Sequence, residues 1–455
     1  MTFWRPTLGA AEPVYLALVS AIERDLAEGR LQTGEKLPPQ RKLARALGIS
    51  LGTVTRAYAE AERRGLVYGE VGRGTFAGRR PAEDRFGGGT TGGTDLALTW
   101  PLYGLDPDLG AALRELSLRA DLHRFLEYGP NVGHRRHRSA GRQWAEHQGI
   151  TVEEDRIVVC VGAQHAMTVV LGTVCQPGDC LLAEPVTYPG LKALAAAQHL
   201  RLVGVPMDEE GMLPDAFRSL CESRRPRALY TIPTIQNPTA AVLGEDRKDE
   251  IAAIAREHGV AIIEDEVHRL LHPDPPPAFA TIAPDITYTI LSLSKVVAGG
   301  LRVAFLVTPP GRAERVGHLL WATTWMAPPL MAEVGARWIE DGTAAATALR
   351  KRQEAAARQA IAAEELGRDS YRSAPNAYHV WLPLPRGWSA ADFTLECERR
   401  GVAVSSAATF AVSREHAGDA VRLSLTGPAS RDDLRRGLRT VAGVLHAELP
   451  ATPVI

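Results

Sequence analysis

The spacing of apolar residues in the first 80 positions predicts a small helical module. Apolar residues recur at helical spacing over 15–26, and two further helices are predicted over 40–47 and 51–64, the last one capped by Ser50. Residues 66–76 alternate and turn as a short hairpin does. Three helices followed by a two-stranded wing are typical of an α+β winged helix-turn-helix.

The pattern changes after about residue 95, where short β-rich runs alternate with helical segments such as 245–258. This alternation predicts an α/β domain with a mostly parallel sheet that helices cover on both faces. A smaller α+β subdomain is expected from about residue 332, with a long helix over 340–365 leading into it. The predicted strands span 156–161, 180–184, 228–233, 260–265, 288–292 and 303–308.

A glycine-rich stretch separates the two patterns. Residues 86–94 contain five glycines and no apolar side chain after Phe86, a composition that favours flexible coil. The chain is therefore expected to consist of a winged helix-turn-helix domain over 10–80, a flexible linker over 81–95 and a large domain over 96–455.

The composition is that of a soluble globular protein, with 455 residues of which 45% are hydrophobic and 23% are charged. No apolar run approaches the roughly 18 residues of a membrane helix, and the N-terminus lacks a signal-peptide pattern. We therefore expect a cytoplasmic protein without a membrane partner. The five cysteines lack metal-ligand spacing, so we expect reduced thiols and no metal site.

The net charge of −1 hides an asymmetry between the two domains. The first 80 residues contain 13 Lys and Arg against 8 Asp and Glu, while the remainder of the chain is acidic overall. A basic module joined to an acidic one favours contact between the basic module and nucleic acid.

Only six of the 52 basic residues are lysines, so any lysine chemistry is restricted to a few positions. Lys295 follows a predicted strand, and its context suits a catalytic lysine that forms a Schiff base with an aldehyde cofactor. The hydroxyls of Ser292 and Ser294 and the guanidinium of Arg302 suit the phosphate dianion of such a cofactor. An exposed loop lysine is the alternative interpretation of this motif taken alone.

Further candidates for a pyridoxal phosphate site follow in chain order, each near the end of a predicted strand. Ala163 and Gln164 open a helix whose backbone N–H groups suit a phosphate. Tyr188 is suited to lie flat against the pyridine ring, and Asn237 to donate to its phenolic oxygen. Asp265 is suited to accept from the pyridine nitrogen, which lets the ring act as an electron sink.

Arg422, late in the chain, is suited to clamp the carboxylate of an amino compound in bidentate fashion. Each candidate taken alone also fits a helix cap, a turn, a core position or a surface ion pair. Their ordered occurrence in one chain favours pyridoxal 5′-phosphate (PLP) as the cofactor, bound at Lys295.

The first module resembles the GntR family of winged helix-turn-helix regulators over residues 13–78, on the stretches 38–50, 53–58, 65–67 and 72–76. The resemblance implies that the module binds double-stranded DNA, with its third helix in the major groove and Arg side chains on phosphates. A role in binding another protein is the alternative. The DNA-facing positions that the resemblance implies are Arg41, Ser50, Leu51, Gly52, Thr53, Thr55, Arg56 and Arg73.

Residues 95–455 resemble the fold-type I aminotransferases of class I/II. The resemblance implies that the sites form at the interface of a homodimer, and that a Tyr of the neighbouring subunit, matched here by Tyr128, helps to bind the cofactor phosphate. His268 stands where the family usually has a Tyr that donates a hydrogen bond to the phenolic oxygen, and a His is able to donate there too.

Together, the two modules resemble the MocR subfamily of GntR regulators over essentially the whole chain. The resemblance implies a PLP-dependent transcriptional regulator that senses PLP, or an amino compound held by Arg422, and changes the fit of a homodimer to its operator DNA. Two other functions stay open from the sequence. One is an active PLP-dependent aminotransferase with an accessory DNA-binding domain, and the other is a DNA-binding protein with a vestigial domain that does not use PLP.

Overall fold

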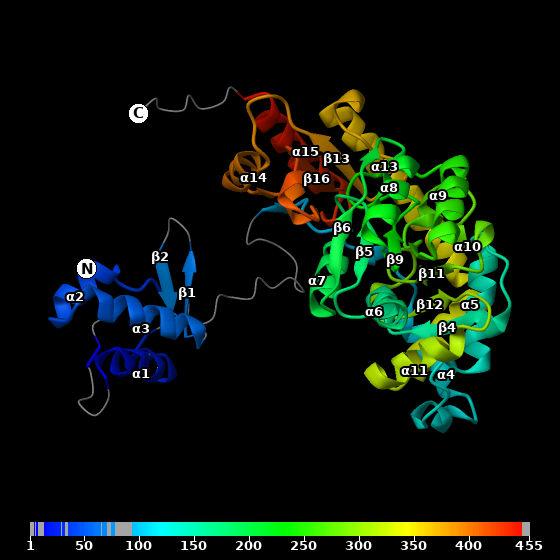
Figure 1. Cartoon of the computed structure of the whole chain (residues 1–455), viewed down its shortest axis with the longest axis horizontal. Helices are drawn as coiled ribbons and strands as arrows, with labels where there is room; N and C mark the ends of the chain where they lie inside the picture. Colours follow the sequence, from blue (N-terminus) through cyan, green and yellow to red (C-terminus); the bar gives the residue numbers. More distant parts are fainter. Residues whose placement is uncertain are drawn as a thin grey trace. The chain divides into compact units, whose positions relative to one another are not determined.

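The computed structural model describes residues 4, 6–7, 13–28, 30–31, 35–64, 66–70, 74–77 and 93–447. The chain divides into two compact units, Met1–Gly89 and Thr90–Ile455 (Figure 1). Most of the predicted linker over 81–95 lies outside the described residues. In the part of the chain that is described, no helix has the length and apolar content needed to cross a bilayer.

The described residues of the small unit form three helices and an antiparallel hairpin, as predicted. Buried Leu18, Ile22 and Tyr58 pack the first helix against the third. The hydroxyl of Ser50 accepts a 3.0 Å hydrogen bond from the backbone N–H of Thr53 and so caps the third helix. The elements are α1 (Val14–Ala27), α2 (Gln40–Leu47), α3 (Leu51–Arg63), β1 (Val67–Glu70) and β2 (Gly74–Ala77).

A seven-stranded sheet is the centre of the large unit, in the strand order β4-β12-β11-β10-β9-β5-β6 (Figure 1). All of its neighbouring strands pair in parallel except β12, which is antiparallel to both β4 and β11. The six predicted strands are confirmed, and the edge strand β6 is an addition. The strands are β4 (Ile157–Cys160), β5 (Cys180–Ala183), β6 (Arg201–Gly204), β9 (Ala228–Thr231), β10 (Ala261–Asp265), β11 (Thr287–Ser292) and β12 (Ala304–Val307).

Helices cover both faces of this sheet, because its strands are apolar on both sides. Along β4, Ile157 and Val159 point into a core shared with α5 and α12, while Val158 and Cys160 point into a core shared with α6 and α11. The helices are α4 (Leu109–Ser117), α5 (Arg135–His147), α6 (Gly162–Val174), α7 (Pro189–Ala197), α8 (Pro214–Arg224), α9 (Glu245–His258), α10 (Phe279–Ile282), α11 (Ala313–Thr324) and α12 (Pro329–Glu340); β7 (Met207–Asp208) pairs with β8 (Gly211–Met212).

The prediction of one helix over 340–365 was wrong at its start. Gly342 adopts a left-handed conformation with φ of 83°, so α12 ends at Glu340 and a separate helix, α13 (Thr343–Leu366), begins beyond it. The subdomain that follows contains β13 (His379–Pro383), α14 (Ala390–Arg399), β14 (Val402–Ala403), β15 (Ser405–Ser406), β16 (Ala420–Ser424) and α15 (Arg431–Leu445).

The first described strand of the large unit, β3 (Thr94–Asp95), pairs in parallel with β14 of this subdomain. The chain that continues from β3 brings the backbone carbonyls of Ala97 and Thr99 to the junction of sheet and subdomain. The Ala97 carbonyl accepts a hydrogen bond from Arg422, and the Thr99 carbonyl accepts one from Lys295.

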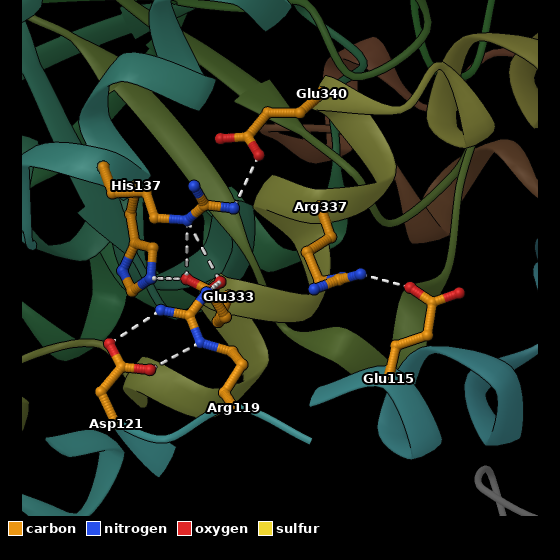
Figure 2. A network of polar contacts seen from close by, with 8 residues as sticks. Glu115, Arg119, Asp121, His137, Glu333, Arg337 and Glu340 are labelled. Atoms are coloured by element: carbon orange, nitrogen blue, oxygen red, sulfur yellow. Dashed lines mark hydrogen bonds and ion pairs between the residues drawn. The ribbon is translucent and has the colours of Figure 1, made fainter. Parts of the chain in front are cut away.

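A buried ionic network joins α12 to the segments before and within α5 (Figure 2). Glu333, with 1% of its side chain exposed, accepts hydrogen bonds from Arg119 Nη1 at 3.0 Å, Arg136 Nε at 3.1 Å and His137 Nε2 at 3.0 Å. Arg119 also pairs with Asp121 through two nitrogens. One buried carboxylate therefore fixes three basic side chains on two segments of the chain.

Candidate cofactor site

A cavity of about 420 Å³ lies where β4, β10 and β11 end, a usual place for ligands in parallel sheets. Side chains from the subdomain, including His379 and Arg422, close it from the other side. The structure brings together here all of the predicted cofactor and effector residues except Tyr128, namely Ala163, Gln164, Tyr188, Asn237, Asp265, His268, Ser292, Ser294, Lys295, Arg302 and Arg422.

Hydrogen-bond donors gather at one end of the cavity. The first turn of α6 has no side-chain cap, so the backbone N–H groups around Ala163 and Gln164 are not satisfied by the helix. Beside them, Ser292 Oγ lies 3.0 Å from Ser294 Oγ, and Arg302 Nη1 donates to Ser294 Oγ at 3.4 Å. Backbone N–H groups, two hydroxyls and a guanidinium match the phosphate of PLP in both charge and hydrogen bonding.

Gly162 makes this close approach possible. It adopts φ of +74°, and a Cβ at this position would overlap the Arg302 guanidinium. We expect Gly162→Ala to weaken PLP binding by roughly tenfold, because a left-handed alanine costs about 1–2 kcal/mol and Arg302 must move. Gly178→Ala is the matched control, since Gly178 also has positive φ but nothing within 4 Å of the added Cβ. Equal PLP dissociation constants for the two variants, measured by absorbance titration, would contradict this assignment.

Asp265 lines the cavity at the end of β10. Its Oδ2 accepts a 2.9 Å hydrogen bond from the Tyr230 hydroxyl, and its Oδ1 accepts from the Val267 N–H at 3.2 Å. Burial raises the pKa of Asp265 to about 6, although the Tyr230 hydrogen bond opposes this rise. At neutral pH the group is a buried carboxylate, which suits a protonated pyridine nitrogen. Tyr230 was not predicted from the sequence, although a tyrosine within a buried strand requires a hydrogen-bond partner.

Lys295 lines the same cavity and donates a 2.6 Å hydrogen bond to the carbonyl of Thr99. Burial and the positive charge of Arg422 together lower the pKa of Lys295 to about 8, against the attraction of Asp265. About one amine in ten is therefore neutral at pH 7, far more than for an ordinary lysine.

His268 lines the cavity, and a backbone carbonyl orients its ring. Its Nδ1 lies 3.0 Å from the carbonyl oxygen of Ile235, and because a carbonyl only accepts, Nδ1 carries the proton. Burial lowers the pKa of His268 to about 4, so the ring is neutral at pH 7 and presents the lone pair of Nε2. The hydrogen bond from His268 to the phenolic oxygen stays a prediction.

A second histidine, His379 on β13, was not predicted from the sequence. Its Nε2 donates to the carbonyl of Gln236 at 3.0 Å, and its buried Nδ1 has no hydrogen-bond partner among the described residues. The rings of His268 and His379 lie 5.9 Å apart. The cavity therefore has two neutral imidazoles on one wall.

Arg422 on β16 is held at three points. Its Nη1 donates to Asn237 Oδ1 at 2.8 Å, its Nη2 donates to the Ala97 carbonyl at 2.6 Å, and its guanidinium carbon lies 4.6 Å from the centre of the Phe410 ring. Burial lowers the pKa of Arg422 to about 10, which leaves it charged at neutral pH. Its buried Nε has no partner in the described part of the chain, as expected of a group that receives a carboxylate. Because Asn237 accepts through Oδ1, its Nδ2 is left to donate.

The two tyrosines of the predicted site are placed differently. Tyr188 precedes α7 and lines the cavity, half-buried. Tyr128 does not line it; its side chain is 82% exposed and its ring lies 5.2 Å from that of Trp325.

In the small unit, six of the predicted DNA-facing residues lie on α3 and at its N-cap, and Arg41 lies on α2. Thr55 Oγ1 donates to Gln40 Oε1 at 2.7 Å, and the Arg56 guanidinium lies 4.0 Å from the centre of the Tyr15 ring. Thr53 is half-buried, and Arg73 lies outside the described residues. The exposed members of the set are Arg41, Ser50, Leu51, Gly52, Thr55 and Arg56.

Two family models match the chain. Residues 95–440 match aminotransferase class I and II, and residues 14–77 match the bacterial regulatory proteins of the gntR family. The HTH-type transcriptional regulator YdeF of Bacillus subtilis is 29% identical over 97% of this chain and 96% of its own length. The HTH-type pyridoxine biosynthesis transcriptional regulator PdxR of Corynebacterium glutamicum is 27% identical over 66% of this chain and 67% of its own length.

A solved structure adds to these matches. The α-aminoadipate aminotransferase LysN of Thermus thermophilus, in complex with N-(5′-phosphopyridoxyl)-L-leucine, superposes with a TM-score of 0.69 and 25% identity, over 78% of this chain and 92% of its own. The family and this neighbour identify pyridoxal phosphate as the cofactor, in agreement with the donor set of the cavity. The chain therefore belongs to the aminotransferase class I and II family, as a MocR-type regulator in which a gntR helix-turn-helix domain is fused to an aminotransferase-like PLP domain.

Proposed function

We propose that this chain is a homodimeric, cytoplasmic transcriptional regulator whose affinity for operator DNA is set by PLP at Lys295 and by an amino compound held at Arg422. One observation carries the proposal. Lys295, Asp265, Arg302 and Arg422 line a single cavity in a chain that also has an exposed, polar recognition helix, α3. We divide the chain accordingly into a DNA-binding domain over 10–80, a linker over 81–95 and an effector domain over 96–455.

In this proposal each group at the cavity has one task. The start of α6, Ser292, Ser294 and Arg302 hold the phosphate, and Asp265 and Asn237 orient the ring. Lys295 provides the amine that binds the cofactor covalently. The cofactor itself supplies an electron sink when it is bound. The buried, positively charged guanidinium of Arg422 favours a carboxylate next to the reactive centre.

An exposed apolar patch supports the homodimer. It consists of Tyr128, Trp321 and Trp325, whose neighbouring rings lie 5.2 Å and 5.5 Å apart, and the exposed fraction of their side chains reaches 82% at Tyr128. A cluster of this kind is expected to be covered by another protein surface. If a second copy covers it, Tyr128 is free to reach the phosphate end of that copy's cavity.

Neutralising Arg41 is expected to weaken DNA binding several-fold on every DNA sequence, because an exposed Arg at the start of α2 is placed for a phosphate contact. The slope of log affinity against log salt concentration should fall by about one in Arg41→Gln. Arg64→Gln is the control, since Arg64 lies beyond the end of α3 and pairs with Glu60 at 2.7 Å. An unchanged salt slope in Arg41→Gln would remove Arg41 from the DNA interface.

Footprinting of DNA upstream of the encoding gene tests the proposal. The full chain is compared without PLP, with PLP, and with PLP plus candidate amino acids. We expect one protected region whose boundaries or affinity change between these states. In the proposal the dimer has two conformations that differ in their fit to DNA, and the ligands bind these conformations with different affinities. Identical footprints in all three states would overturn the effector model.

The unpartnered Nε of Arg422 and the lowered pKa of Lys295 also favour a second function, that of an active aminotransferase. Multiple turnovers of an amino acid with a saturating keto-acid acceptor would support it. Turnover in the absence of any sequence-specific binding to DNA would overturn the regulator proposal in favour of the enzyme.

A further inference from the structure

A second cavity, of about 560 Å³, lies away from the cofactor residues. It is formed by the end of α5, the first turns of α13 and the short 3-10 helix η4 (Arg269–Leu271). None of the residues that line it in the described part of the chain lines the cofactor cavity. We name it the η4–α13 cavity.

The η4–α13 cavity is lined by two arginines, Arg269 and Arg352, and also by the side-chain amide of Gln148. The side chain of Arg269 is 3% exposed. Its Nε donates to the Gln148 carbonyl, and its Nη1 donates to Glu266 and to the Pro276 carbonyl. Its Nη2 therefore has no partner among the described residues. Arg352 has no hydrogen-bond or ion-pair partner in the described part of the chain. No carboxylate lines this cavity among residues 93–447.

A histidine adds a further donor. Nδ1 of His272 accepts a 3.2 Å hydrogen bond from the backbone N–H of Asp274, so the proton of the neutral ring is on Nε2. The apolar lining consists of Leu270 on η4 and of Ala345, Ala348 and Leu349 on α13. Free donors beside aliphatic side chains are complementary to an anion that carries a short hydrocarbon chain.

We propose that the η4–α13 cavity is a second ligand site, which binds a small aliphatic carboxylate with its acidic group on Arg352 and Arg269 and its chain against α13. The fork of the Arg352 guanidinium matches a carboxylate in bidentate geometry. The site does not depend on the chemistry of PLP.

The site is connected to the cofactor cavity by a short chain of contacts. Arg269 donates to Glu266 Oε1 at 3.1 Å, and the hydroxyl of Thr234 donates to the same oxygen at 3.1 Å. Glu266 directly follows Asp265, and His268 directly precedes Arg269. A carboxylate that binds Arg269 therefore changes the contacts of the segment that carries the cofactor-facing side chains of Asp265 and His268.

Calorimetric titration of the PLP-loaded full chain with sodium hexanoate tests the proposal, at constant ionic strength. We expect saturable binding by the natural protein and at least about tenfold weaker binding by Arg352→Gln, because a charge-assisted hydrogen-bond pair is lost. Leu349→Asp is a second variant, since Leu349 is exposed and an added carboxylate repels the ligand. Hexanoate should also change the absorbance of the bound cofactor in the natural protein.

Two controls separate this site from others. Arg422→Gln should keep the affinity for hexanoate, whereas loss of binding in this variant would place hexanoate in the cofactor cavity and overturn the proposal. Arg142→Gln, on the surface of α5 and paired with Glu146, should bind as the natural protein does.

Undiminished binding by both Arg352→Gln and Leu349→Asp would overturn the site. Inorganic phosphate that binds more tightly than hexanoate would overturn the carboxylate class, and an unchanged cofactor spectrum at saturation would contradict the connection.

Discussion

Lys295→Ala is expected to lose the covalent attachment of PLP completely, and with it the absorbance band of the Schiff base at every PLP concentration. Among the described residues, Lys295 is the lysine that lines the cofactor cavity. Lys192→Ala is the control, because Lys192 also donates to a backbone carbonyl, that of Thr409 at 2.9 Å, without lining the cavity. A Schiff-base band retained by Lys295→Ala in the absence of amino acids would contradict the assignment.

The pH dependence of PLP capture follows from the same residue. The neutral amine is the reactive form, and burial with the charge of Arg422 lowers the pKa of Lys295 to about 8. The rate at which the PLP-free protein captures PLP should therefore rise about tenfold per pH unit below pH 8 and level off above it. Stopped-flow absorbance measures this rate. A rate that keeps rising to pH 10 would indicate an ordinary lysine.

Glu333→Ala is expected to destabilise the large unit by about 3–5 kcal/mol, because it leaves Arg119, Arg136 and His137 in a partly buried site without their shared carboxylate (Figure 2). Calorimetry should show a melting temperature several degrees lower. Glu115→Ala is the control. Glu115 pairs with Arg337 at the surface beside the network in Figure 2, and its loss should cost less than about 1 kcal/mol. Equal shifts for the two variants would contradict the role of Glu333 as the centre of the network.

Acid sensitivity provides an independent test of this network. Burial raises the pKa of Glu333, but the hydrogen bond from His137 and the charges of Arg136 and Arg119 outweigh this effect and hold the pKa below its ordinary value. A lowered folded-state pKa means that the stabilisation is complete above about pH 4.5 and is lost as the pH falls through the folded-state pKa. Glu333→Gln should therefore lose less stability on acidification than the natural protein does.

Local patterns in the sequence were sufficient for the main elements and for most of the cofactor residues. Apolar runs predicted the central strands because those strands are buried on both faces. The site residues were predicted because parallel strands end at one edge of the sheet, so Lys295, Asp265 and Asn237 converge although they are far apart in the chain. The edge strand β6 was missed, since it is partly exposed and starts with Arg201.

The parts that could not be predicted depend on contacts between distant segments. His268 is oriented by the carbonyl of Ile235, 33 residues earlier, and this contact decides which ring nitrogen faces the cavity. Arg422 and Lys295 are held by the carbonyls of Ala97 and Thr99, which reach the site only because β3 pairs with β14. Backbone carbonyls are the same in every residue type, so no side-chain pattern indicates these partners.

The dissociation constant of the full chain for its footprinted DNA, measured as PLP is titrated, tests the central claim most directly. The regulator proposal predicts that the affinity of the natural protein for DNA changes with PLP, at the same midpoint as the cofactor absorbance. It predicts no change for Lys295→Ala over the same PLP range. A DNA affinity that is independent of PLP in the natural protein, or an identical response in Lys295→Ala, would contradict it.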